Sequence, residues 1–374
     1  MLSAKGVREL AVFPCPGGGQ VVVKDGFAYI GHITGPTGTT IVDVREPTRP
    51  RQVATVPVAE GLHSHKVQVH GDLMLVNREI TDATLAKERG GLAIFDVRDR
   101  SQPRQLAMWH CDGSGIHRFT FDGRYAYISP EVEGYLGNIV MILDLADPAN
   151  PVEVSRWWMP GQWAAGGETR TWKGYQHRCH HAIRDGDRLY VSYWHGGAVI
   201  LDISDIAKPR LVSQIDWSPP FHWPTHSMVP VQQRIHGHRW AIVADEDVNP
   251  LTTDVPSQTM PAALWMVNIS DETRPVPVAS FQVEGLDGQD NPGKSGCHQP
   301  VEFIPGLEVP VAWFAQGVRF IDISNPRSLR EVAHYIPDPA PGHERASSND
   351  VYVDERGLIF LIDRFGGLAI LERE

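Results

Sequence analysis

The feature that most constrains the fold is a short phrase that recurs about every fifty residues. In each copy an apolar run ends in Asp or Asn, and a turn and a proline follow. The copies are Ile41-Val42-Asp43-Val44, Ile94-Phe95-Asp96-Val97, Ile142-Leu143-Asp144-Leu145, Ile200-Leu201-Asp202-Ile203, Met266-Val267-Asn268-Ile269, Phe320-Ile321-Asp322-Ile323 and the truncated Leu368-Ala369-Ile370-Leu371. A repeat of this length indicates one architecture built from similar supersecondary units.

Two further strand-like runs around a tight turn lie upstream of these phrases. Examples are residues 21–24 and 27–30 around Asp25-Gly26, and residues 119–121 and 125–128 around Asp122-Gly123. Asp-Gly between alternating apolar runs is a strong hairpin signal. Each unit therefore has four short antiparallel strands, and repeating such units radially predicts an all-β, seven-bladed β-propeller.

The two ends of the chain complement each other. The last unit, residues 349–372, lacks its outer strand, and residues 7–13 match the missing strand. We expect these segments to share a blade, which closes the ring and hides the sheet edges. The prediction is a single domain over residues 1–374. Two separate β-domains are the main rival, but they would not explain one strand missing at one end and present at the other.

Charge and cysteine content exclude several classes of protein. The chain has 34 Lys and Arg against 45 Asp and Glu, a formal net charge of −11. Binding to nucleic acid without sequence preference, or to an anionic membrane, needs a basic face, so we expect neither partner. The four cysteines are widely spaced and form no CxxC pair. This pattern favours a reducing, cytoplasmic location over a disulfide framework.

Histidines occupy equivalent places in the repeat. The first residue of the innermost strand should line the mouth of the central opening, and across the units these residues are Gln20, His65, His117, His181, His226, His298 and Asn349. Several imidazoles that converge are hard to satisfy without a metal or a bound anion, and histidine is the commonest metal ligand. The predicted metal ligands are His65, His117, His181, His226 and His298.

We expect three or four of these histidines to ligate, with an open position for substrate. The preferred set is His65, His181, His226 and His298. His117 is held in reserve because Arg118 adds positive charge beside it. Two alternatives stay open: each histidine could hydrogen-bond a neighbouring blade, or a register error of one or two residues would bring in His63, His177 or His180.

Carboxylates and arginines follow the second strand of several units. None stands in the ring itself, which disfavours Ca²⁺ and Mg²⁺ and favours Fe first, then Mn, Cu or Zn. Glu79, Glu131 and Glu246 are candidates to accept a ring N–H from a ligand. Alternatively, they form salt bridges with Arg78, Arg118 or Arg364. Asp245 is a candidate ligand or general base, and the predicted catalytic group is Glu79, Glu131, Asp245, Glu246, Arg78 and Arg364.

Aromatic residues gather in the connections that should lie over the ring. The connections span residues 159–180, 217–224 and 247–260, and long connections in compact domains often form binding walls. The predicted substrate-binding residues are Trp163, Trp172, Tyr193, Trp194 and Trp223. A wall of this kind suits an apolar or aromatic small molecule. Alternatively, these side chains pack between blades or at a contact in a homo-oligomer.

Three resemblances accompany these patterns. The phrase "LDISD…KPRLVSQI" resembles the bacterial LVIVD repeat, which implies a propeller fold. The stretch "LYVSYWHGGAVILDISDIAKPRLVSQI", residues 189–215, is similar to a blade of the selenium-binding protein and methanethiol oxidase group. A histidine ring backed by glutamates looks like the carotenoid cleavage oxygenases, in which four histidines hold ferrous iron.

These observations favour a metal-dependent enzyme. The absence of a ring carboxylate favours O₂-dependent redox chemistry on an apolar or aromatic small molecule. A lyase or hydrolase that uses the metal as a Lewis acid is the first alternative. The second alternative is a non-catalytic interaction scaffold, although a scaffold has no need of aligned histidines.

Overall fold

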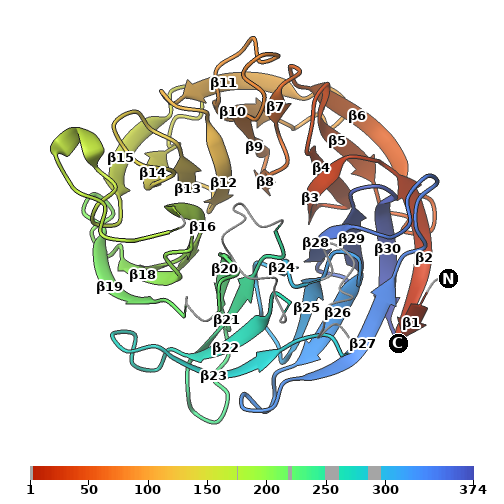
Figure 1. Ribbon diagram of the computed structural model, residues 1–374. Coiled ribbons are helices and arrows are strands. Elements are labelled where there is room, and N and C mark those ends of the chain that lie inside the picture. Colours follow the sequence, from red (N-terminus) through yellow and green to blue (C-terminus); the bar gives the residue numbers. More distant parts are fainter. Residues whose placement is uncertain (1–2, 175, 218–220, 249–260, 285–295) are drawn as a thin grey trace.

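Strands arranged radially around a central opening make up the molecule (Figure 1). The computed structural model describes residues 3–174, 176–217, 221–248, 261–284 and 296–374. Within these residues the helical structure is the short 3₁₀ element η1 (Ala164–Gly166). None of the described segments is a helix long and apolar enough to cross a membrane. The all-β propeller class predicted from the repeat is confirmed.

Each radial unit is an antiparallel meander with its first strand at the opening and its last strand at the rim (Figure 1). The first unit has β3 (Gly18–Lys24), β4 (Phe27–His32), β5 (Thr37–Asp43) and β6 (Arg51–Pro57). The second has β7 (Leu62–His63), β8 (Val67–His70), β9 (Leu73–Ile80), β10 (Gly91–Asp96) and β11 (Arg104–His110). The third has β12 (Ile116–Phe121), β13 (Tyr125–Pro130), β14 (Val140–Asp144) and β15 (Val152–Trp157).

The next two units form one eight-stranded sheet, because Trp194 pairs with Thr225 between them. Their strands are β16 (His177–Asp185), β17 (Arg188–Trp194), β18 (Ala198–Asp202) and β19 (Arg210–Ile215), then β20 (Thr225–Pro230), β21 (Trp240–Asp245), β22 (Leu264–Asn268) and β23 (Val276–Phe281). The sixth unit has β24 (Gln299–Pro300), β25 (Glu308–Ala312), β26 (Val318–Asp322) and β27 (Arg330–Ile336).

The last unit closes the ring as predicted. It contains β28 (Ser348–Val353), β29 (Ile359–Asp363) and β30 (Gly367–Arg373), and β2 (Val7–Pro14) adds its outer strand. The pairing of β2 with β30 runs from Val7↔Arg373 to Pro14↔Gly367, and the two termini lie side by side in Figure 1. In addition, the repeat did not predict β1 (Ser3–Lys5), which pairs with β27.

The recurring Asp or Asn has a local structural cause. Asp43 Oδ1 accepts the backbone N–H of Arg45 at 3.1 Å, and Asn268 Oδ1 accepts that of Ser270 at 2.9 Å. Asp322 repeats the contact with Ser324 at 2.9 Å. Such side-chain bonds two residues along the chain stabilise turns. The phrase therefore marks the turn between the third and fourth strands of each unit.

The apolar core lies between neighbouring units. Leu75 and Ile94 of the second unit, for example, belong to one buried cluster with Phe119 and Ile128 of the third. Because each sheet buries both faces against its neighbours, its middle strands are nearly continuous apolar runs. This packing holds the inner strands in place and leaves their first residues to line the opening.

Candidate metal centre

Bulges at the start of the inner strands build the ring of side chains at the mouth. In β12, β20 and β28 the pairing register shifts where His117, His226 and Asn349 stand. The same shift occurs at Gly19 in β3. A bulged residue leaves the ladder and its side chain is re-aimed. The bulges thereby turn one side chain per strand toward the opening.

The fourth unit needs a correction of one residue. In β16 the ladder resumes at His181, which pairs with Ser192, so His180 is the bulged residue. The His181 backbone N–H reaches Ser192 Oγ at 3.1 Å, as that of Arg118 reaches Ser129 Oγ at 2.9 Å. His181 therefore corresponds to Arg118, and His180 corresponds to His117. The prediction of His181 at the mouth was wrong by one residue, because it assumed a strand without a bulge.

The first unit shows the same displacement, with Gly19 rather than Gln20 at the ring position. A Cβ atom on Gly19 would lie 2.5 Å from His65 Cβ, so only glycine fits there. The structure places His181 one layer deeper, where its Nε2 lies 3.5 Å from Glu302 Oε1. The residues at the mouth are thus Gly19, His65, His117, His180, His226, His298 and Asn349.

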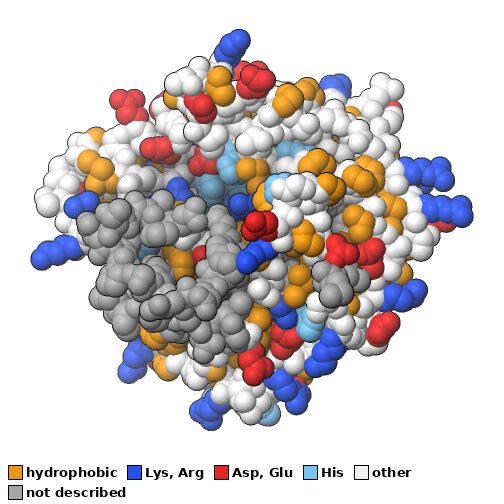
Figure 2. Space-filling view, turned by 45° about the vertical axis from the view of Figure 1, so that its right-hand side comes forward, with side chains coloured by type: hydrophobic (Ala, Val, Ile, Leu, Met, Phe, Trp, Pro, Cys, Tyr) orange, Lys and Arg blue, Asp and Glu red, His pale blue; other side chains and the backbone are white. Residues whose placement is uncertain are grey.

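Five histidine rings form an arc at the mouth. Their neighbouring ring centroids are 5.0 Å apart for His65 and His117, 4.9 Å for His117 and His180, 4.4 Å for His180 and His226, and 4.2 Å for His226 and His298. His63, an alternative weighed from the sequence, joins the arc with its ring 4.0 Å from that of His65. Figure 2 shows histidine side chains in a hollow of one face, with acidic and basic side chains beside them.

Hydrogen bonds fix which nitrogen of each ring faces the hollow. His180 Nδ1 donates to the His226 carbonyl oxygen at 2.8 Å, and His298 Nδ1 donates to that of Asn349 at 2.6 Å. A neutral imidazole that donates through Nδ1 carries its lone pair on Nε2. This arrangement is the one in which metal-ligating histidines are held.

His117 is oriented by a carboxylate. Its Nδ1 lies 2.7 Å from Glu79 Oε2, and His63 Nδ1 lies 3.9 Å from the same oxygen. Burial acts to raise the pKa of Glu79, but His117 and His63 outweigh it and lower the pKa to about 2. Glu79 is therefore ionised and accepts the His117 ring N–H.

The most informative distance joins two acceptor nitrogens. His117 Nε2 and His180 Nε2 lie 3.1 Å apart. Because both rings engage hydrogen-bond partners through Nδ1, their lone pairs face one another unless a proton or a cation lies between them. Metal–nitrogen bonds of about 2.0–2.1 Å place neighbouring ligand atoms roughly 3.0–3.4 Å apart. The observed separation fits two ligands of one metal.

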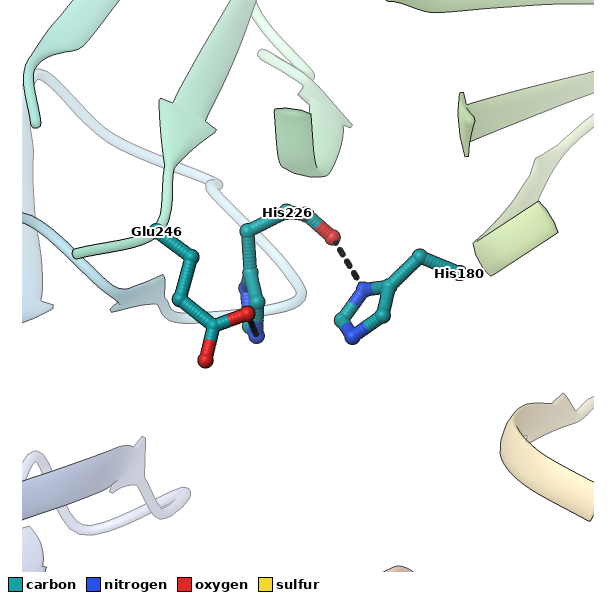
Figure 3. Close-up of side chains that lie close together, drawn as sticks. All are labelled: His180, His226 and Glu246. Atoms are coloured by element: carbon teal, nitrogen blue, oxygen red, sulfur yellow. Dashed lines mark hydrogen bonds and ion pairs between the residues drawn. The ribbon is translucent and has the colours of Figure 1, made fainter. Parts of the chain in front are cut away.

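A carboxylate that the ring positions did not predict as a ligand completes the group. Glu246, directly after β21, places Oε2 3.9 Å from His226 Nε2 and Oε1 3.7 Å from His298 Nε2. One ligand atom each from His180, His226 and Glu246 lie within 4.8 Å of one another. Figure 3 shows both rings and the carboxylate turned toward the same space. Glu246, which was expected to accept a ring N–H from a ligand, therefore lies where it can itself offer a ligand atom.

Arg118 adds a buried positive charge beside the histidines. Its Nη2 donates to His226 Nε2 at 3.0 Å and its Nη1 donates to Gln299 Oε1 at 2.9 Å. Burial, and then Arg118, lower the pKa of His180 and His226 well below the ordinary value. These rings are thus neutral, which is the form that binds metal.

Several predicted catalytic residues lie apart from the histidines. Glu131 hydrogen-bonds Ser114, and Arg78 bonds Ser64 and the carbonyl of Pro57 at 3.3 Å. Asp245 accepts the Trp265 indole N–H at 2.6 Å, and burial raises its pKa to about 8. The alternative was that the glutamates form salt bridges with Arg78, Arg118 or Arg364. Among the described contacts, Glu79 bonds His117 and Glu131 bonds Ser114 instead.

Arg364 lies at the mouth instead. Its Nε–H donates to Asn349 Oδ1 at 2.8 Å, and its guanidinium carbon stands 5.3 Å from the Phe314 ring centroid. The Phe314 ring is in turn 4.4 Å from that of His298. Arg364, one of the predicted catalytic residues, therefore lies next to the histidine arc.

The predicted substrate-binding aromatics divide into two groups. The Trp194 ring lies 5.9 Å from that of His180, and Trp172 stacks on His177 with ring centroids 4.6 Å apart. Tyr193 is a correction: it is fully buried, and its hydroxyl donates to Gln162, so it is a core residue. Trp163 packs on Trp158 at 5.6 Å, away from the arc.

Other parts of the predicted wall are only partly described. Trp223 packs against the largest apolar cluster and lies 5.3 Å from the ring of His222. The connection over residues 247–260 lies mostly outside the described residues, as do residues 218–220 of the connection before Trp223. These two connections therefore remain predictions.

The opposite half of the channel holds a separate cavity of about 610 Å³. Gln20, Lys66, Glu302 and Asp350 line its inner end. Lys66 Nζ donates to Glu302. This ion pair separates the cavity from His181, which lies one layer below the histidine arc. Burial, reinforced by Glu302, raises the pKa of Asp350 to about 7.

Comparison with known proteins supports the fold. The LVIVD repeat model matches residues 18–57, 120–157, 185–216 and 311–336. The chain is a β-propeller, and these four segments of it match the LVIVD repeat. No curated protein sequence matches it. The carotenoid oxygenase resemblance receives no support from these comparisons.

Solved propellers match the chain over most of its length. The WD40 repeats of RRP9 have a TM-score of 0.65 at 10% identity and cover 100% of both chains. A periplasmic gluconolactonase of Pseudomonas aeruginosa has a TM-score of 0.58 at 14% identity over 88% of this chain and 91% of its own. The propeller of Cps50 (Swd1) has a TM-score of 0.61 at 12% identity over 98% and 99%. At these identities the likeness concerns the fold alone.

Proposed function

We propose that this propeller is a metal-dependent enzyme whose metal is held at the mouth of the central opening. The ligands proposed are His117, His180, His226 and Glu246, with His65 and His298 beside them. The observation that carries the proposal is the 3.1 Å separation of the His117 and His180 Nε2 atoms. The buried imidazoles of His180 and His226 are neutral, and His117 and His180 are held through Nδ1, which supplies the form and direction that a transition metal requires.

The donor set favours redox chemistry. His180, His226 and Glu246 supply the two histidines and one carboxylate that are typical of non-haem ferrous oxygenases, and His117 would add a third histidine. We therefore propose O₂-dependent oxidation of a small apolar or aromatic molecule, with iron first and Mn, Cu or Zn as other candidates. When bound, the metal would supply the redox chemistry.

The protein's own residues have defined tasks in this proposal. Glu79 holds the His117 ring, and the His226 carbonyl holds the His180 ring. Arg118 donates to His226 Nε2, so metal binding through that atom would replace this hydrogen bond. Trp194, beside His180, would pack against an apolar part of the substrate.

A second candidate is a lyase or hydrolase at the same site. The Glu79–His117 pair favours it, because with His117 as a base instead of a ligand, a carboxylate-bound imidazole next to an open position is a suitable general base. In this case the metal would act as a Lewis acid. The two candidates differ in whether O₂ is consumed.

The proposal is tested by metal analysis of protein purified without an affinity tag or chelator. We expect about one transition-metal ion per chain, lost in His226→Ala and Glu246→Ala. His70→Ala, which changes an exposed histidine in β8, is the matched control and should keep the metal. Wild-type protein that binds no transition metal, even after incubation with Fe(II), would refute the proposal.

A second measurement separates the two candidates. Nitric oxide binds ferrous iron at an open coordination position, and the product has a distinctive electron paramagnetic resonance spectrum. We expect this spectrum for the iron-loaded protein if O₂ is activated there. Loaded protein that remains silent, but hydrolyses or cleaves substrates without consuming O₂, would favour the second candidate.

A further inference from the structure

An arginine with no carboxylate partner among the described residues stands beside the proposed metal site. The Arg178 guanidinium carbon lies 3.7 Å from the Trp194 ring centroid, and the Trp194 ring lies 5.9 Å from that of His180. The Arg178 Nε–H is buried and has no hydrogen-bond partner in the described part of the chain. A buried guanidinium normally has its donors satisfied, because leaving them without an acceptor is costly. Arg178 therefore has donor capacity that no described residue uses.

Arg364 repeats this arrangement at the other end of the arc. It stands over Phe314, whose ring is next to His298, as Arg178 stands over Trp194 next to His180. Only its Nε–H has a described partner, Asn349 Oδ1. Each arginine thus lies over an aromatic ring at the edge of the histidine arc.

The charges around the mouth favour an anionic ligand once a metal is bound. Arg178 and Arg364 both interact electrostatically with Glu246, so both lie near the proposed ligand set. Arg118 adds a third positive charge next to His226. The acidic side chains that interact with Arg178 and Arg364 are Glu79, Glu131, Glu246 and Asp363. Glu79 and Glu131 are already engaged by His117 and Ser114, and a bound divalent cation would add two positive charges.

We propose that the mouth binds a carboxylate-bearing substrate, with Arg178 as its anchor. This inference rests on the proposed function and names its substrate class. The planar fork of a guanidinium matches a carboxylate with two parallel hydrogen bonds. The aromatic neighbours suit an apolar or aromatic body attached to that group. Arg178 is a substrate-positioning residue in this account.

The test is calorimetric titration with benzoate and with benzamide, its neutral analogue. Wild-type protein should bind benzoate more tightly than benzamide, with and without metal. Arg178→Gln should weaken benzoate binding by about tenfold or more, the loss of one charge-assisted interaction, and leave benzamide binding unchanged. Arg178→Lys should retain part of the affinity, which guards against a folding defect in the Gln variant.

The control is Arg156→Gln. Arg156 also stands over an aromatic ring, 5.8 Å from the Tyr135 centroid, but it is paired with Glu153. This variant should bind benzoate like wild type. The inference is overturned if benzoate and benzamide bind equally, if Arg178→Gln leaves benzoate affinity unchanged, or if inorganic phosphate binds Arg178 more tightly than benzoate does. The titration is also run without metal, so benzoate binding is measured independently of the metal. A protein that binds no metal would refute the proposed function, and the benzoate titration would still test the role of Arg178.

Discussion

His180 Nδ1 donates to the backbone carbonyl of His226, so the ring of one propeller unit is held by the main chain of the next. The bond leaves His180 Nε2 opposite His117 Nε2 at 3.1 Å. His298 is held by Asn349 in the same way. Packing between units therefore sets the direction in which these imidazoles point before any ion binds.

Replacing each of two adjacent histidines with alanine tests the register of the fourth unit. His180→Ala should weaken Co(II) binding by more than the about 10–100-fold that loss of an outer hydrogen-bond partner causes. His181→Ala should have a smaller effect, because its side chain lies one layer deeper beside Glu302. Calorimetry gives both affinities, and melting curves check that both variants fold. Loss of metal in His181→Ala alone would show that the assignment is reversed.

Removing the carboxylate that holds His117 should have an intermediate effect. Glu79→Gln keeps the size of the side chain but removes the charge that faces His117 Nδ1 at 2.7 Å. We expect metal affinity to fall by about 10–100-fold while the ligands themselves remain. Glu131→Gln is the control, because Glu131 bonds Ser114 and no histidine. Equal losses in the two variants would argue against a specific role for Glu79.

The N-terminal strand should contribute to stability. Deleting residues 1–13 removes nearly all of β2 and exposes the edge of β30, its partner over seven residue pairs. We expect the melting temperature to fall by several °C. Deleting residues 1–5 removes only β1, which pairs with β27 over Ser3–Lys5, and should cost less. A truncation at residue 13 that melts like the full chain would contradict ring closure by β2.

The buried Asp350 should make stability depend on pH. Burial, with Glu302, raises its pKa from 3.8 to about 7 against the opposing effects of Lys66 and Arg118. The folded protein therefore holds this proton more strongly than the unfolded chain. The stabilisation is complete below the unfolded pKa and is lost as the pH rises toward the folded pKa.

Asp350→Asn should remove this dependence while its side-chain oxygen still accepts the Val21 N–H. Relative to wild type, the metal-free variant should be more stable at about pH 8 than at about pH 5. Denaturant unfolding at both pH values measures the difference. A difference that is the same at both would mean that Asp350 titrates normally.

The repeat predicted the fold well because its signals are local. Asp43 and its equivalents stabilise turns within a few residues, and the missing strand at residues 349–372 had a match at residues 7–13. His65, His117, His226 and His298 were placed at the mouth for the same reason. A bulge has no comparable signature, so His181 was chosen where His180 lies at the mouth.

Features that depend on contacts between strands or between units were harder to predict. Glu246 reaches His298 of the following unit, and Arg178 acquires its environment from Trp194 of the next strand. Tyr193 and Trp194 are consecutive residues of a strand, so their side chains point to opposite faces. The Tyr193 side chain therefore lies in the core, where it contacts Gln162. Spacing along the chain carries little information about such contacts.

The most direct test of the metal centre is anomalous X-ray diffraction from crystals of protein loaded with Fe(II) in the absence of chelator. Difference maps from data above and below the iron edge should contain one strong peak at the mouth. We predict that it lies within about 2.0–2.3 Å of both His117 Nε2 and His180 Nε2, with Glu246 in the coordination shell. The account is contradicted if these maps are empty at the mouth while the two nitrogens remain at hydrogen-bond distance, sharing a proton in place of a metal.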